Sequence, residues 1–211
     1  MNSVLSLILI LIGSYLIGSV PTAYLVVRRK AGVDIRKAGS GNVGAFNTFD
    51  VTKSKIVGIT VGVLDALKGF LVSASLAWLL KSSCEVQEAG LVCAIIGHNY
   101  PVWLKFKGGR GLATGAGGLF AVGLSYTIAW CVVWAVTYGA RKDILLGNLA
   151  AIFAAPLILL IVPAAWIEAL GVVAQTAASF RTFAFILSGL LILSHLDAIK
   201  NLRTNRKAGN E

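Results

Sequence analysis

Long apolar runs separated by short charged segments make up most of the chain, and this pattern predicts membrane-spanning helices. A transmembrane helix needs roughly 20 predominantly apolar residues, and it satisfies its own backbone hydrogen bonds within lipid. We therefore predict an all-α integral membrane protein with a single transmembrane helical domain over residues 1–211. The apolar segments lie near 4–27, 56–80, 89–104, 113–138, 144–162 and 178–194.

The first apolar run, from Val4 to Val27, is interpreted as a retained span and not as a cleaved signal. It is longer than the apolar core of a secretory signal peptide, which has about 7–15 residues, and no basic residues precede it.

The composition supports a membrane protein with basic surfaces. Hydrophobic residues make up 57% of the chain and charged residues 13%, against about 25% charged residues in a typical soluble domain. The net charge is +10, but the basic residues flank apolar segments, which indicates a membrane surface and anionic ligands instead of nucleic acid. The three cysteines form no paired motif, so we expect no disulfide framework, no metal site and no cofactor.

The basic residues predict the topology, because they concentrate on the cytoplasmic side of membrane proteins. Seven Lys and Arg lie in 28–55, three in 105–111, two in 139–143 and four in the tail from Lys200. All four segments reach the cytoplasm only if the chain crosses twice between 112 and 138.

We therefore divide the apolar run after Gly111 into two crossings. A single helix over these 27 residues would be about 40 Å long, and the run contains several glycines that favour a break. The predicted pieces are a short helix over 112–123 and a fuller one over 125–138. This gives about seven crossings, with the N-terminus outside and the C-terminus cytoplasmic. Motif loops near 28–55, 105–111 and 195–211 would then face the cytoplasm.

The segment "GSGNVGAFN", residues 39–47, offers neutral hydrogen-bonding groups among glycines. Ser40, Asn42 and Asn47 can orient a ligand, while the glycines allow tight turns and a close approach of the backbone. A flexible glycine-rich connector is an alternative interpretation.

The segment "KFKGGRGLATG", residues 105–115, indicates a phosphate site. Backbone N–H groups in a glycine-rich turn and the N-terminus of a following helix both favour anions. The candidate binding residues are Lys107, Gly108, Gly109, Arg110 and Gly111. The motif lacks the spacing of a Walker A loop, and a basic turn at the membrane surface remains an alternative.

Three ionisable groups near or within apolar runs are further candidates. In "LDALKG", residues 64–69, Asp65 and Lys68 share one helix face, and intramembrane charges are often functional; a self-paired structural ion pair is equally compatible. His195, at the end of the last apolar run, is a candidate base because its ordinary pKa suits proton transfer. We interpret His98, in "GHNYP", as structural.

Together these stretches resemble the acyl-phosphate-dependent glycerol-3-phosphate acyltransferases of bacterial membranes. The matching residues run in order over the first two-thirds of the chain, as "GVDIRKAGSGNVGAFN" at 32–47, "LDALKG" at 64–69 and "GHNYPVWLKFKGGRGLAT" at 97–114. The resemblance implies a multi-pass protein of the bacterial cytoplasmic (inner) membrane whose active site faces the cytoplasm. It also implies the first step of phospholipid synthesis.

The implied reaction moves a long-chain acyl group from acyl phosphate to the sn-1 hydroxyl of sn-glycerol 3-phosphate, giving lysophosphatidic acid and phosphate. On this reading Ser40, Lys68 and His195 are catalytic candidates, and the glycine-rich second motif binds the glycerol phosphate. The expected partners are the two substrates and the lipid bilayer, with no nucleic acid.

The chain departs from the family pattern at three positions. The usual first motif reads GATN and continues to an arginine, whereas this chain has Phe46 for the threonine and Asp50 for the arginine. The usual third motif reads HREN, whereas "HLDA" at 195–198 ends in Ala198, with Asn201 one turn further on. The alternative to an active enzyme is therefore a catalytically weakened homologue that binds or transports a phosphorylated small molecule or lipid.

Overall fold

The computed structural model describes residues 3–208, with side chains over residues 4–200. Its regular elements are helices, as the sequence predicts. They are α1 (Ser3–Gly18), α2 (Thr22–Ala31), α3 (Ala45–Thr52), α4 (Lys55–Ala74), α5 (Cys84–Asn99), α6 (Leu112–Val122), α7 (Ser125–Arg141), α8 (Ile144–Ile161), α9 (Ala164–Ala169) and α10 (Ala177–Ala208). Short turns of other helix types lie at Ile35–Lys37, Ser75–Leu79 and Val102–Leu104.

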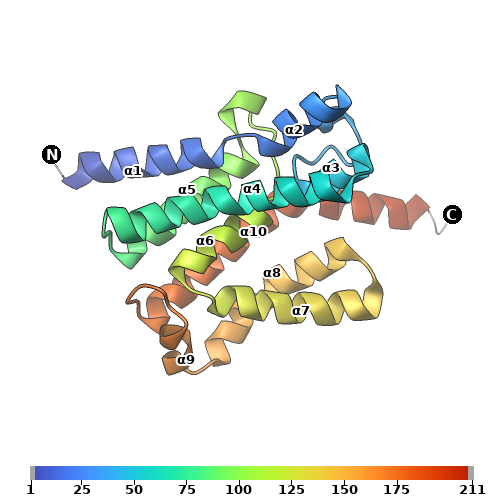
Figure 1. Ribbon diagram of the computed structural model, residues 1–211. Coiled ribbons are helices and arrows are strands. Elements are labelled where there is room, and N and C mark those ends of the chain that lie inside the picture. Colours follow the sequence, from blue (N-terminus) through green and yellow to red (C-terminus); the bar gives the residue numbers. More distant parts are fainter. Residues whose placement is uncertain (1–2, 209–211) are drawn as a thin grey trace. The chain divides into compact units, whose positions relative to one another are not determined.

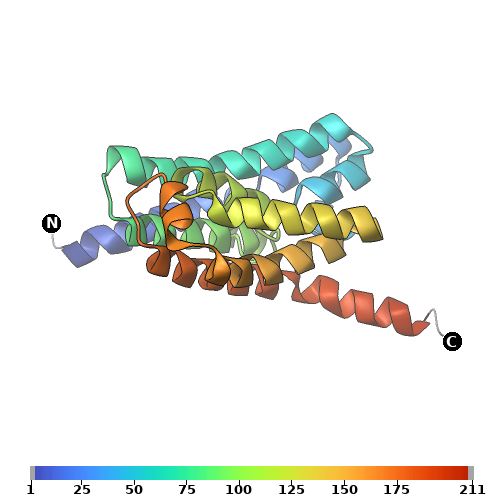
Figure 2. The same ribbon diagram turned by 90° about the horizontal axis from the view of Figure 1, so that it is seen from below.

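The chain folds into two compact units. The first comprises the chain up to Gly123 together with Val172–Ala174, and in it α4 packs along α6 while α1 packs along α5 (Figure 1). The second comprises Leu124–Gly171 and the chain from Gln175, and in it α8 lies beside α7 and also packs on α10 (Figure 2). The expectation of one domain stays a prediction.

Within residues 3–208, four helical stretches are long and apolar enough to cross a membrane, which supports an integral membrane protein. They are Val4–Ala31, Lys55–Leu79, Ile144–Ile161 and Ala177–Lys200. A shorter apolar helix covers Leu112–Val122. The predicted division of the run after Gly111 is confirmed, since α6 ends before Gly123 and α7 begins at Ser125. The number of seven crossings stays a prediction.

The first apolar run forms one candidate membrane span, Val4–Ala31, as expected, but its helix is interrupted between α1 and α2. Pro21 has no backbone N–H and disfavours helical backbone at the residue before it, so the helix ends before Val20 and restarts at Thr22. The tail also differs from the expected loop, since α10 continues through residues 195–208. The side chains after Lys200, including Asn201 and the tail basics Arg203, Arg206 and Lys207, lie outside the described residues.

Two glycines allow α4 and α6 to approach closely. A Cβ atom at Gly69 would overlap the carbonyl of Thr114, and one at Gly117 would overlap the carbonyl of Ala66. This contact fixes α6, and with it the loop that precedes α6, against α4.

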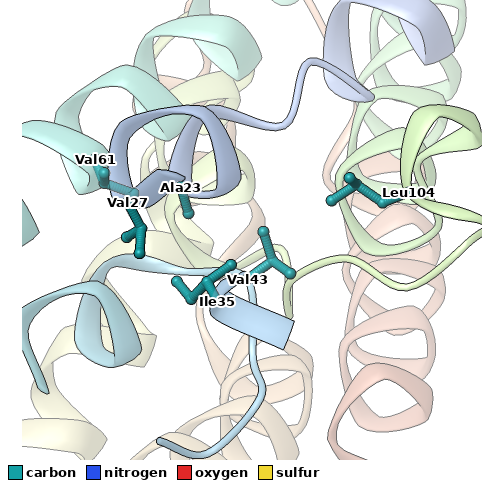
Figure 3. Packing of buried hydrophobic residues seen from close by; sticks show 6 residues of the cluster. All are labelled: Ala23, Val27, Ile35, Val43, Val61 and Leu104. Carbon is teal, nitrogen blue, oxygen red and sulfur yellow. The ribbon is translucent and has the colours of Figure 1, made fainter. Parts of the chain in front are cut away.

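A small apolar core lies beneath the loop that follows α2. Ala23 and Val27 of α2 face Ile35 and Val43 of that loop (Figure 3). The whole cluster consists of Ala23, Val27, Ile35, Val43, Val61 and Leu104. Burying these side chains anchors the first glycine-rich segment to the membrane helices.

Candidate active site

The two glycine-rich segments meet in the first unit. The N–H of Val43 donates to the carbonyl of Gly108 at 3.3 Å. Arg36 adds a second link, since its Nη1 donates to the carbonyl of Leu104 at 3.1 Å. The motifs that the sequence places about 60 residues apart are therefore in direct contact.

An ion pair orients Arg36 for this link. Its Nη2 lies 2.7 Å from Asp34 Oδ2, and its Nε lies 3.0 Å from Asp34 Oδ1. The guanidinium holds the pKa of the Asp34 carboxyl at about 2, below its usual 3.8. The same carboxylate caps the short helical turn that follows, because Oδ1 accepts from the N–H of Arg36 at 3.0 Å.

Asn47 organises the first segment from within. Its side chain is 1% exposed, and its Nδ2 lies within hydrogen-bonding distance of the carbonyls of Ala38 at 3.1 Å and Asn42 at 2.9 Å. Its Oδ1 accepts from the N–H of Ser40 at 2.9 Å. Asn47 therefore shapes the loop around Ser40, whose side chain is exposed.

The second segment uses its first two glycines to hold the loop on α5. The N–H of Gly108 donates to the carbonyl of Asn99 at 3.0 Å, and that of Gly109 to the carbonyl of His98 at 3.1 Å. These two N–H groups face the protein, which differs from the anion-binding turn that the sequence suggests.

Backbone N–H groups outside the helical ladder lie further along, at the start of α6. Gly111 has a left-handed backbone with φ of 80° and gives the helix no side-chain cap. The first intrahelical bond runs from the N–H of Gly115 to the carbonyl of Gly111 at 2.8 Å. The N–H groups of residues 112–114 therefore precede the helical ladder, where the helix dipole favours an anion.

A buried amide lies against this helix start. Asn99 is 3% exposed, and neither its Oδ1 nor its Nδ2 has a hydrogen-bond partner among the described residues. The Asn99 amide contacts Gly111, since a Cβ there would lie 2.7 Å from Oδ1. Buried polar groups are seldom left unpaired, so this amide is a binding candidate that the sequence analysis missed.

The cations around the loop differ in exposure. Lys107 is exposed, while Arg110 is half-buried and engaged in further interactions. After the first segment, Asp50 of α3 pairs with Lys53 at 2.7 Å, and both side chains are exposed.

A buried polar cluster lies beneath the loop. Lys68 Nζ lies 2.9 Å from Asp65 Oδ1, so the ion pair that the sequence analysis left as one of two alternatives is present. The same Nζ lies 2.7 Å from His98 Nδ1 and 3.2 Å from the carbonyl of Val20. Val20 lies in the short non-helical link between α1 and α2. Thr22 donates its hydroxyl to Asp65. Lys68 is 6% exposed, so its ammonium faces protein acceptors.

His195 belongs to the second unit, unlike the other candidates. It is fully buried in α10, and its Nδ1 lies 2.7 Å from the carbonyl of Leu191. Ala198, at the family's asparagine position, is also buried. The catalytic role of His195 stays a prediction. Among the described residues, no three His, Cys, Asp or Glu side chains gather as a metal site.

These features define an all-helical integral membrane protein with a loop and helix start suited to an anion. Comparison with known proteins makes the assignment specific. A family model described as glycerol-3-phosphate acyltransferase matches residues 8–205. The chain belongs to this family.

Individual relatives support the same family assignment. The glycerol-3-phosphate acyltransferase 2 of Moorella thermoacetica is 42% identical over 160 residues, which cover 75% of this chain and 80% of that protein. Two crystal structures of PlsY (YgiH), an integral membrane glycerol 3-phosphate acyltransferase, are 31% identical. The match to the glycerol 3-phosphate form has a TM-score of 0.77 and covers 95% of this chain and 94% of the PlsY chain. The lysophosphatidic acid form has a TM-score of 0.75 and covers 95% and 93%.

Proposed function

We propose that this protein transfers a long-chain acyl group from acyl phosphate to the sn-1 hydroxyl of sn-glycerol 3-phosphate. The proposal rests on the polar groups that lie at the start of α6 in a member of this family. There, uncapped N–H groups, the unpaired amide of Asn99 and the charge of Arg110 gather at one loop. A phosphomonoester matches this set, since it is anionic and accepts several hydrogen bonds.

The reaction needs little covalent machinery from the protein. The sn-1 oxygen attacks the acyl carbonyl, a new ester C–O bond forms, and the bond from the carbonyl carbon to the phosphate oxygen breaks. Phosphate leaves with the electron pair, and the hydroxyl proton passes to a base, which is His195 or a substrate phosphate oxygen. The protein's contribution is to hold two anionic headgroups together, which cations and oriented donors achieve.

Each loop residue receives a role in this scheme. Arg110 and the N–H groups at the start of α6 hold the phosphate of glycerol 3-phosphate, and Gly108, Gly109 and Gly111 allow the loop to lie on α5. Lys107 adds an exposed positive charge. The polar groups of the first segment, Ser40, Asn42 and Asn47, orient the substrates directly or by shaping the loop.

The acyl chain is assigned to an apolar groove between α3 and α4. The groove is an open depression of about 340 Å³, lined mainly by apolar side chains and glycines, with Lys55 among the lining residues. It follows directly on the first glycine-rich segment, because α3 begins at Ala45. The charge of Lys55 suits an anionic lipid headgroup.

The topology proposed with this function has seven crossings in the bacterial inner membrane, with the N-terminus outside. Both glycine-rich segments and the C-terminus then lie at the cytoplasmic surface. The support is the distribution of basic residues together with the division between α6 and α7.

A weakened homologue that binds a phosphorylated ligand without acyl transfer is the second candidate. Asp50 favours it, because a carboxylate lies where the family usually has an arginine. The loop before α6 supports phosphate binding under both proposals, so turnover decides between them.

The test uses purified protein in mild detergent or lipid mesophase, with palmitoyl phosphate and glycerol 3-phosphate. Phosphate release and lysophosphatidate formation are followed, and palmitoyl-CoA serves as the control donor. We expect turnover with acyl phosphate alone. Saturable glycerol 3-phosphate binding without turnover would instead support the weakened homologue.

Arg110→Ala then tests the phosphate site. Losing hydrogen bonds to a charged group corresponds to about a 10- to 100-fold rise in the KM for glycerol 3-phosphate. Arg29→Ala, which removes an exposed arginine of α2, is the matched control and should leave the KM unchanged. An equal effect of both variants would contradict the assignment.

A further inference from the structure

The buried ammonium of Lys68 has as many protein acceptors as hydrogens. A lysine ammonium donates three hydrogen bonds. Its neighbours are Asp65 Oδ1 at 2.9 Å, the Val20 carbonyl at 3.2 Å and His98 Nδ1 at 2.7 Å. Two of these atoms can only accept, and all three bonds are made if His98 Nδ1 accepts as well.

This hydrogen count assigns the tautomer of His98. An imidazole nitrogen that accepts a hydrogen bond carries no proton, so the ring proton of neutral His98 must lie on Nε2. Asp65 Oδ1 also lies 3.5 Å from Nδ1, but Lys68 Nζ is much nearer at 2.7 Å, a normal hydrogen-bonding distance. Lys68, and not the carboxylate, is therefore the partner that fixes the ring.

The other edge of the ring faces the loop. A Cβ at Gly109 would overlap His98 Nε2, and the same point lies 2.5 Å from the carbonyl oxygen of Val43. Nε2 therefore lies where the two glycine-rich segments meet, next to the bond from the Val43 N–H to Gly108. A small cavity of about 10 Å³ also lies here, with His98, Lys68, Thr22 and Val43 among its lining residues.

We propose that Lys68 is a positioning residue for acyl transfer: it holds His98 as the Nε2–H tautomer, and His98 in turn orients the junction of the two substrate-binding loops. Lys68 acts through His98 and does not touch the phosphate. The junction sets the distance between the groups assigned to the two headgroups. The expected kinetic effect rests on the proposed function. The assignment of the His98 tautomer is independent of it.

Nitrogen-15 NMR of histidine-labelled protein tests the tautomer directly. The chain has two histidines, so His98→Gln assigns both signals. We expect wild-type His98 to carry its proton on Nε2, and Lys68→Met to abolish that preference. A proton on Nδ1 in the wild type, or an unchanged pattern in Lys68→Met, overturns the proposal. The wild-type spectrum decides even if the variant fails to fold.

Kinetics test the positioning role. The nitrogen of a Gln side chain can replace Nε2–H, whereas Asn reaches only the Nδ1 position. We expect His98→Asn and Lys68→Met to raise the KM for glycerol 3-phosphate about tenfold, and His98→Gln to stay within about threefold of the wild type. Lys81→Met removes an exposed lysine and is the control. Equal losses in both His98 variants would leave only a structural role for the ring and overturn the proposal.

The failure of the proposed function is recognised separately. A wild-type protein without turnover on any donor would refute acyl transfer, and the NMR result would stand. Glycerol 3-phosphate affinity, measured by calorimetry, then replaces the KM in the same set of variants, with the same expected ratios.

Discussion

Asp50 Oδ1 lies 2.7 Å from Lys53 Nζ, so the carboxylate at the family's usual arginine position is neutralised by a lysine one helical turn away. The two side chains are 49% and 78% exposed, and such surface pairs contribute about 0–1 kcal/mol. The pair therefore lacks the net positive charge that an arginine would supply at this position.

Asp50→Arg should increase the affinity for glycerol 3-phosphate. A positive charge at this position adds about 1 kcal/mol of attraction at a solvated surface, which corresponds to a KM lowered about fivefold. Asp50→Asn removes only the negative charge and should give a smaller decrease. Steady-state kinetics at low salt measure both, and a higher KM for Asp50→Arg would show that the carboxylate has a role of its own.

Gly109→Ala should disrupt the loop. The added methyl group would overlap the ring of His98 and the carbonyl of Val43, and overpacking of this kind costs about 1–3 kcal/mol. We expect a lower thermal midpoint and little activity. Gly13→Ala is the matched control in α1, because nothing lies within 4 Å of its Cβ position. A Gly109→Ala protein with normal activity would contradict the contact.

Alanine substitutions of Asn47 and Asn42 should affect different properties, with Asn47→Ala lowering stability and Asn42→Ala weakening substrate binding. Asn47→Ala leaves several buried loop groups without a partner, which we expect to cost about 2 kcal/mol and to lower the melting temperature by about 4–8 °C. The side chain of Asn42 is half-buried and assigned to substrate. Asn42→Ala should therefore keep the melting temperature and raise a substrate KM. A lower melting temperature for Asn42→Ala, together with a raised KM alone for Asn47→Ala, would contradict this assignment.

The ion pair of Asp34 with Arg36 predicts a pH dependence of stability. The pKa of Asp34 is about 2 in the folded protein against 3.8 ordinarily, so the charged carboxylate stabilises the folded state above about pH 4. This contribution disappears as the pH falls toward 2. Asp34→Asn keeps a capping group but loses the charge.

Thermal unfolding at several pH values measures this dependence. The wild type should be more stable than Asp34→Asn at pH 6, and the difference should shrink between pH 4 and pH 2. A difference that stays constant over this range would mean that the carboxylate contributes through shape and hydrogen bonding alone.

Much of the fold follows from local sequence features. Glycines after Gly111 predict the division between α6 and α7, because they favour a break in a run too long for one span. Asp65 and Lys68 share a helix face because they are three residues apart, so the sequence allows their pairing as one of two alternatives. Pro21 lies within a continuous apolar run, so hydropathy alone does not reveal the break between α1 and α2.

The site depends on contacts between distant residues, and sequence reasoning foresees these less well. His98 lies 30 positions after Lys68, and only the packing of α5 on α4 brings their side chains together. The same holds for Gly108 and Gly109, whose N–H groups face the end of α5 because the loop folds back on it. Asn99 lies within the quoted stretch 97–114, but only its burial without hydrogen-bond partners distinguishes it as a binding candidate.

The acceptors around Lys68 also constrain how the protein is made. Chain synthesis delivers the carbonyl of Val20 first, then α4 with Asp65 and Lys68 together, and His98 last. A lone charge at a helix centre costs about 2.5–3.5 kcal/mol to insert, so α4 enters the bilayer carrying its own counter-ion. Until α5 arrives, the ammonium lacks its third acceptor. The Lys68 ammonium therefore gains its full set of three hydrogen bonds only late in biogenesis, when α5 docks.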